Sequence, residues 1–105
     1  MTETGINQKW KNLISDIFKK YPGIELVKLY GSRAKGDFNE RSDIDLVVFG
    51  EKIDRFIISK MLLDFDDLDI PNKIELQQYN DIKNQKLKEH IDRIGKVFYE
   101  KINLN

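Results

Sequence analysis

The segment from residue 31 to residue 46 constrains the fold more than any other part of the chain, because it joins two predicted strands. Residues 25–30 lead into it and residues 44–49 lead out of it, and both stretches are rich in the apolar and β-branched side chains typical of strands. The segment opens on Gly31-Ser32 and ends with Asp43-Ile44-Asp45-Leu46. We therefore expect the chemistry of the protein to lie between these two strands.

Length and composition limit the class of protein. At 105 residues the chain is long enough to bury one core, so we expect a single domain over residues 1–105. The absence of cysteine excludes disulfides, thiolate zinc sites and cysteine nucleophiles, and makes the cytoplasm the expected compartment. The longest mainly apolar run, residues 56–63, is far too short to span a membrane, and the N-terminus lacks signal-peptide character. We expect no membrane association.

The charge balance argues against a nucleic-acid substrate. The 18 Lys and Arg residues equal the 18 Asp and Glu residues, so the formal net charge is zero. A domain without a basic field lacks the electrostatic attraction that holds a nucleic-acid backbone. A polymer substrate is therefore disfavoured.

Hydrophobic periodicity predicts an α+β domain. Helical spacing predicts helices over residues 6–18, over residues 54–65 with Asp54 as the cap, and from Asn80 or Asp81 to Gly95. The second of these has a wide apolar face, so we expect much of it to be buried. Strands are predicted over residues 25–30, 43–50 and 73–79, with a short strand over residues 97–100. The order α-β-β-α-β-α indicates an α+β (mixed α/β) domain, a small mixed sheet flanked by helices.

Two carboxylates stand two positions apart on the second predicted strand. Side chains two apart on a strand point to the same face, so Asp43 and Asp45 project together, about 7 Å apart at their Cα atoms. Two bare carboxylates about 6 Å apart repel by about 3 kcal/mol at an effective dielectric constant near 20. A bound cation turns this repulsion into coordination, and oxygen-only ligands suit Mg²⁺ or Mn²⁺. The bland alternative is a solvated strand edge.

Glu75 is the predicted third carboxylate. It alternates with Ile74 and Leu76 on the third predicted strand, which could pair beside the strand of the two aspartates. Asp43, Asp45 and Glu75 would then hold metal ions that clamp a triphosphate, while one carboxylate helps to deprotonate an attacking hydroxyl. The alternative for Glu75 is an exposed strand charge.

Gly31, Ser32 and Arg33 are the predicted nucleotide-binding residues. A glycine directly after a strand lets backbone approach phosphate closely, and a short helix beginning at Ser32 or Arg33 would aim free N–H groups at it. Arg33 and Lys35 could neutralise phosphate charge, although both types are more often solvated turn residues. His90 stands between Glu89 and Ile91 on a polar helix, and we interpret it as a surface residue.

The pattern Gly31-Ser32, ten intervening residues and Asp43-x-Asp45 resembles the signature of the nucleotidyltransferase superfamily that includes polymerase β. The fuller Gly-Ser-Arg-Ala-Lys-Gly, with Ser-Asp-Ile-Asp-Leu, is similar to the small prokaryotic branch, the minimal nucleotidyltransferases. The third strand with its carboxylate, and the helix ending near Gly95 and Val97-Phe98-Tyr99, extend the likeness almost end to end.

The resemblance implies transfer of AMP from ATP to an acceptor hydroxyl, with release of pyrophosphate and a requirement for magnesium. It implies that Asp43 and Asp45 bind the metal and that Gly31 and Ser32 hold the triphosphate. Similar minimal members are commonly paired with a separate HEPN-domain protein in toxin-antitoxin modules, where they act as antitoxins and can adenylylate a tyrosine of the toxin. The resemblance leaves open whether homo- or hetero-oligomers form.

One residue departs from the branch. Ile74-Glu75-Leu76 stands where the branch usually has Val-Asp-Leu, and the extra methylene moves the carboxylate by about 1.5 Å. Because about 1 Å of misplacement can cost about a hundredfold in rate, activity could be reduced unless the strand shifts. Two alternatives follow: a weak or inactive antitoxin that neutralises its partner by binding, and nucleotidylation of a small molecule such as an aminoglycoside. The chain has no second domain to build the pocket that the last of these needs.

Overall fold

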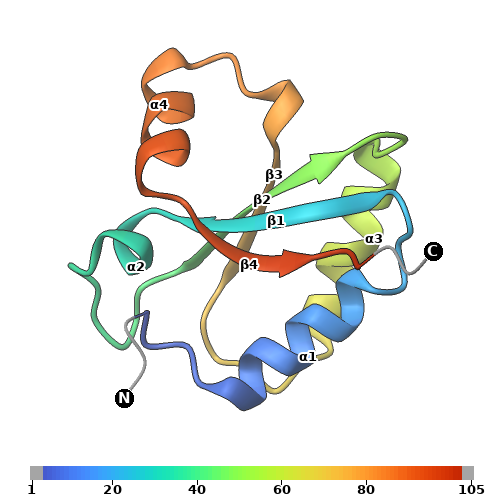
Figure 1. Ribbon diagram of the computed structural model, residues 1–105. Helices are drawn as coiled ribbons and strands as arrows, with labels where there is room; N and C mark the ends of the chain where they lie inside the picture. The colour runs from blue at the N-terminus through green and yellow to red at the C-terminus, as the bar shows by residue number, and fades with distance from the viewer. Residues whose placement is uncertain (1–3, 103–105) are drawn as a thin grey trace.

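The computed structural model describes residues 4–102 and shows a four-stranded sheet with helices packed on it (Figure 1). The helices are α1 (Gln8–Phe18), the short α2 (Ser32–Lys35), α3 (Arg55–Asp66) and α4 (Gln85–Ile94). The strands are β1 (Ile24–Tyr30), β2 (Ile44–Gly50), β3 (Ile74–Gln78) and β4 (Lys96–Glu100), and a 3-10 turn, Tyr79–Asp81, follows β3. The predicted mixed α/β architecture is confirmed.

The order of strands in the sheet is β3-β2-β1-β4. β1 runs antiparallel to both of its neighbours, whereas β2 and β3 are parallel and are connected through α3. A parallel pair needs such a crossover, because the chain must return to the edge where the first strand began. The β1–β2 connection therefore lies at the same end of the sheet as the start of β3.

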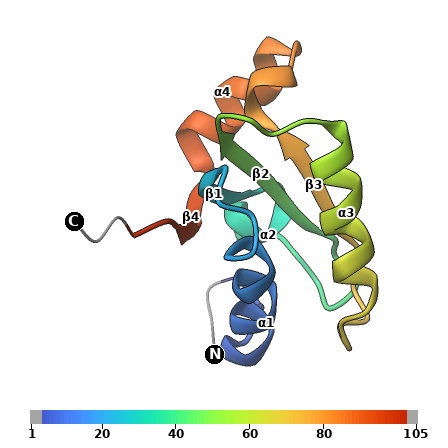
Figure 2. The same ribbon diagram turned by 90° about the vertical axis from the view of Figure 1, so that its right-hand side faces the viewer.

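Each face of the sheet has its own core. The larger core holds α1, α3 and the side chains of Ile44, Leu46 and Val48, which are at most 1% exposed. The smaller core lies under α4 and contains Tyr30, Val47, Ile82 and Ile91. Figure 2 shows α4 separated from α1 and α3 by the sheet. Side chains along β2 thus alternate between the two cores. The two aspartates lie on the same face of the sheet as the smaller core under α4.

Side chains fix where the helices begin. Asp54 accepts a hydrogen bond from the Ile57 N–H at 2.9 Å, which confirms the predicted cap of α3. Asn7 caps α1 in the same way through the Trp10 N–H at 2.8 Å, so the helix begins at Gln8 and the buried Ile6 precedes it. None of the helices among the described residues combines the length and apolar character that a membrane crossing requires.

Two predictions about the helices were wrong. The last helix begins at Gln85 and not near Asn80, because the Asn84 side chain accepts from the N–H groups of Lys86 and Leu87 and so caps a later start. The predicted burial of α3 fails at Phe56 and Leu63, which are 69% and 66% exposed. Only one side of α3 meets the sheet, so an apolar face wider than that side extends into solvent.

Candidate functional site

The three predicted carboxylates come together where β2 and β3 begin. Asp45 and Glu75 are direct partners in the parallel register, and Asp43 precedes Asp45 by two residues. One oxygen from each of Asp43, Asp45 and Glu75 lies within 4.8 Å of the others. Asp43 is exposed, whereas Asp45 and Glu75 are half-buried. We call this group the acidic trio.

Core packing orients the trio. Ile44 and Leu46 are fully buried in the larger core, so the aspartates that alternate with them face the opposite side of the sheet. Ile74 and Leu76 pack against the same larger core, so Glu75, which lies between them, faces the same side of the sheet as the aspartates. The sequence-based expectation that strand alternation gathers these carboxylates on one face agrees with the observed geometry.

The trio is electrostatically unfavourable as a bare cluster. Burial, and then the neighbouring charges of Glu75 and Asp43, raise the pKa of Asp45 to about 6, and the opposing effect of Arg33 is smaller. Lys73 offsets part of the charge, since its Nζ lies 3.1 Å from Glu75 Oε1 in an exposed ion pair. Carboxylate oxygens gathered in this way are the donors that hard divalent cations prefer, so the residues present fit a Mg²⁺ or Mn²⁺ site.

Gly31 stands between the end of β1 and the start of α2, in contact with the trio. Its φ is +76°, and a Cβ built on it would overlap Asp45 Oδ2. α2 begins at Ser32 and ends at Lys35, and Gly36 caps it with a left-handed φ of +94° and an N–H that donates to the Ser32 carbonyl at 2.9 Å. The first N–H groups of a helix have no acceptor within it, so Ser32 and Arg33 can present donors beside the trio.

Arg33 has a structural contact that the sequence did not indicate. The side chain is 2% exposed, and its guanidinium donates to the carbonyls of Ser42, at 3.0 and 3.2 Å, and of Thr4, at 2.9 Å. Burial lowers the pKa of Arg33, while Asp43 and Asp45 oppose the shift. These bonds tie α2 to the residue preceding Asp43, and binding of Arg33 to phosphate stays a prediction. Lys35 is exposed and lies 3.8 Å from Asp37.

His90 was interpreted as a surface residue, and that interpretation was wrong. It is half-buried, and its Nε2 accepts a hydrogen bond from the Gly31 N–H at 3.0 Å. Its ring also meets the Tyr30 ring edge-on, with centroids 6.2 Å apart. The spacing held a signal: His90 is three residues after Leu87 and four before Ile94, so it shares the flank of α4 that faces the sheet.

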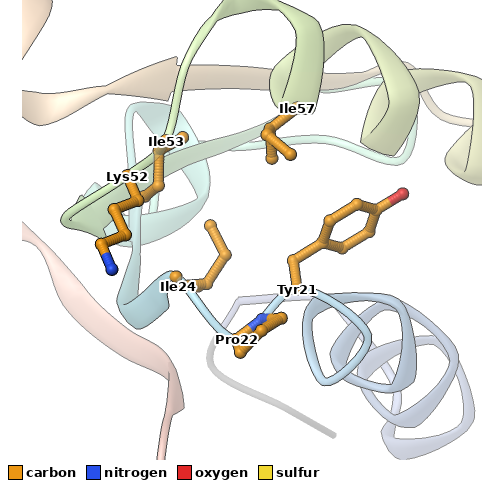
Figure 3. A pocket seen from close by; sticks show the side chains of 7 residues that line it. Tyr21, Pro22, Ile24, Lys52, Ile53 and Ile57 are labelled. Carbon is orange, nitrogen blue, oxygen red and sulfur yellow. The ribbon is translucent and has the colours of Figure 1, made fainter.

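A cavity of about 360 Å³ lies at the other end of β1 (Figure 3). It is lined by Tyr21, Pro22, Gly23, Ile24, Lys52, Ile53 and Ile57. Ile24 is the first residue of β1 and Tyr30 the last, so the cavity is separated from the acidic trio by roughly 20 Å of strand. These seven lining residues include no carboxylate or imidazole, so they lack the oxygen and nitrogen ligands that a divalent metal prefers.

Comparison with known proteins agrees with this geometry. The profile of the family described as "Polymerase beta, Nucleotidyltransferase" matches residues 12–103. MJ0604 of Methanocaldococcus jannaschii, a protein named as a candidate protein adenylyltransferase, is 36% identical over 59 residues, which are 52% of this chain and 59% of MJ0604. The match therefore spans less than two thirds of that relative.

Solved structures share the fold at low sequence identity. A crystal structure of a toxin-antitoxin with AMP-PNP has a TM-score of 0.71 at 19% identity, covering 87% of this chain and 73% of that one. The MntA-HepT toxin-antitoxin has a TM-score of 0.62 at 19% identity, covering 90% and 74%. A tri-AMPylated HEPN toxin in complex with its MNT antitoxin, from Shewanella oneidensis, has a TM-score of 0.53 at 18% identity, covering 87% and 73%.

The family profile spans most of the chain and includes both the Gly31 turn and the acidic trio. The four-stranded mixed sheet seen here matches the fold of the similar solved structures. The chain belongs to the polymerase beta nucleotidyltransferase family.

Proposed function

We propose that this protein is a metal-dependent nucleotidyltransferase that transfers AMP from ATP to a hydroxyl of a partner protein. The acidic trio carries the proposal, because three carboxylate oxygens within 4.8 Å, beside a glycine turn, are suited to a cation and a triphosphate together. A bound Mg²⁺ or Mn²⁺ would supply charge neutralisation for the phosphates. Asp43, Asp45 and Glu75 would hold the cation, and Gly31, Ser32 and Arg33 would position the triphosphate.

The proposed reaction forms one bond and breaks another at the α-phosphorus of ATP. The acceptor oxygen attacks this phosphorus, the bond to the bridging oxygen breaks, and pyrophosphate leaves. The acceptor proton passes to a carboxylate of the trio. This chain's part is to bind, orient and accept the proton.

The proposed acceptor is a tyrosine of a HEPN-domain toxin, which would make this chain a cytoplasmic antitoxin. The similar structures support this role: one is a toxin-antitoxin with AMP-PNP, and another holds a tri-AMPylated HEPN toxin with its MNT antitoxin. The name of MJ0604 supports a protein acceptor.

The test is transfer of radiolabel from α-³²P-ATP to a HEPN-domain protein supplied as the acceptor. We expect labelling in the presence of Mg²⁺ and at least a hundredfold loss with Asp43→Asn or Asp45→Asn. Asp66→Asn, the same change on an exposed residue at the end of α3, is the matched control and should label normally. Equal labelling by all variants, or none by the parent, would refute the enzymatic proposal.

Glu75 supports a second candidate function, an antitoxin that works by binding with a weak or silent site. Its side chain is longer than that of the aspartate that the resemblance implies at this position, and its Oε1 lies 3.1 Å from Lys73 Nζ. Glu75→Asp separates the two functions. A dormant enzyme should label its partner faster after this change, whereas a binder should neutralise the toxin equally well before and after the change, with or without ATP.

A further inference from the structure

The only histidine of the chain connects α4 to the glycine turn. His90 lies 59 residues from Gly31, yet its Nε2 accepts the Gly31 N–H at 3.0 Å. The edge-on contact with the Tyr30 ring, at an interplanar angle of 80°, holds the imidazole from a second side. In Figure 1, α4 and α2 lie at the same end of β1.

The end of the sheet explains why this N–H needs a side-chain acceptor. The register between β1 and β4 ends at the pair Leu29 and Lys96, two residues before Gly31. Beyond that pair the chain is no longer strand but the Gly95 turn and α4, so β4 offers Gly31 no backbone carbonyl in register. A half-buried N–H left without an acceptor would cost free energy, and His90 supplies the acceptor.

Gly31 is thereby held from two directions. On one side Asp45 Oδ2 occupies the space that a Cβ would need, and on the other side His90 holds the amide. The peptide between Tyr30 and Gly31 is consequently fixed in orientation, and the donors that follow it, from Ser32 onward, are aimed by it. A turn that is fixed before the ligand arrives loses less entropy on binding.

We propose that His90 is a positioning residue for the nucleotide: it fixes the Gly31 peptide so that the turn receives the triphosphate beside the acidic trio. The nucleotide part rests on the function proposed above. The contact between His90 and Gly31 does not depend on that function, and it requires one particular tautomer of the imidazole. Because Nε2 accepts, the imidazole must be neutral and carry its proton on Nδ1.

The first experiment detects the hydrogen bond between His90 and Gly31 directly and does not depend on enzymatic activity. ¹⁵N NMR of the imidazole is unambiguous because His90 is the only histidine. We expect the Nδ1–H tautomer, together with slow hydrogen exchange at the Gly31 amide. His90→Leu should accelerate that exchange at least tenfold, and His90→Gln, whose Oε1 can replace Nε2 as acceptor, should restore most of the protection. An Nε2–H tautomer, or equal exchange in parent and His90→Leu, would overturn the proposal.

The second experiment measures binding of a non-hydrolysable ATP analogue by calorimetry, with circular dichroism as the check on folding. His90→Leu should raise the dissociation constant about tenfold, the loss expected for one hydrogen bond to a partly buried donor. His90→Gln should recover part of the affinity. Glu89→Gln, on the exposed side of the same helix, should bind like the parent.

The outcomes distinguish this inference from the proposed function. If the parent binds the analogue and the folded His90→Leu variant binds it equally well, the positioning role of His90 is wrong and the proposed function stands. If the parent binds no nucleotide at all, the proposed function fails and takes the positioning role with it, even where NMR finds the Gly31 contact.

Discussion

The carboxylate of Asp45 lies against the Cα of Gly31, so close that a Cβ on Gly31 would overlap Asp45 Oδ2. The φ of +76° independently disfavours any residue with a side chain at this position. The two halves of the candidate site, the glycine turn and the acidic trio, are therefore in direct contact. A substitution in the glycine turn should therefore alter the acidic trio, and a substitution in the trio should alter the turn.

Gly31→Ala tests this contact. We expect it to destabilise the protein by roughly 1–3 kcal/mol, from the strained φ and the clash with Asp45, and to reduce nucleotidyl transfer about a hundredfold. Urea unfolding and the radiolabel assay measure the two effects. Gly36→Ala is the matched control, because Gly36 also has a positive φ, +94°, but has nothing within 4 Å of its added Cβ. If both variants lost the same activity, the contact with Asp45 would not be the cause.

The pKa of about 6 at Asp45 predicts how stability depends on pH. Between the ordinary value of 3.8 and about 6, the folded protein binds a proton that the unfolded chain does not. This contribution to stability is therefore fully present below about pH 4 and is lost as the pH rises through 6. We expect the metal-free parent to gain stability relative to Asp45→Asn as the pH falls from 7 to 4.5.

Thermal unfolding of the parent and of Asp45→Asn at each pH measures that difference, because the replacement removes the carboxyl group of Asp45 and leaves the residues outside the trio unchanged. Added Mg²⁺ should stabilise the parent at pH 7 more than at pH 5, since protons and cation compete for the same oxygens. A difference between parent and variant that stays constant across this range would contradict the raised pKa of Asp45.

Arg33→Lys tests whether this residue supports the loop. The replacement keeps a positive charge but cannot reach the carbonyls of both Ser42 and Thr4 with a planar fork. We expect a loss of about 2–3 kcal/mol in urea unfolding, because partly buried carbonyls lose a charged donor. Lys35→Ala, at an exposed position on the same turn, should change stability by less than about 0.5 kcal/mol. A variant with parental stability and weak ATP binding would instead indicate that Arg33 contacts phosphate.

Phe18 and Phe56 allow the same substitution to be compared at a buried position and at an exposed one. Phe18 is fully buried and packs edge-on against Phe65, with ring centroids 5.6 Å apart. Phe18→Ala should cost about 3–5 kcal/mol in denaturant unfolding, through lost burial and a cavity. Phe56→Ala removes the same side chain from a site that is 69% exposed and should cost less than about 0.5 kcal/mol. Similar losses for both would mean that the outer face of α3 is covered in solution.

Strand alternation explains why much of the site could be predicted. Asp43 and Asp45 alternate with Ile44 and Leu46, and Glu75 alternates with its own apolar neighbours, so the period of two assigns each carboxylate to a face. Caps are equally local, as Asp54 shows. The start of α4 was missed because a 3-10 turn at Tyr79–Asp81 and a cap at Asn84 compete with an earlier helix start, and the local pattern does not rank them.

The sequence by itself determined the candidate carboxylates and the candidate glycine turn, because the spacing from Gly31 to Asp45 and the period of the strands are local properties of the chain. The tertiary structure decided how they meet: the parallel register that sets Glu75 beside Asp45, the burial of Arg33 against Ser42, and the reach of His90 to Gly31. These contacts join residues 9 to 59 positions apart. Periodicity specifies the face on which a side chain lies, but its partners and pKa depend on which elements pack together.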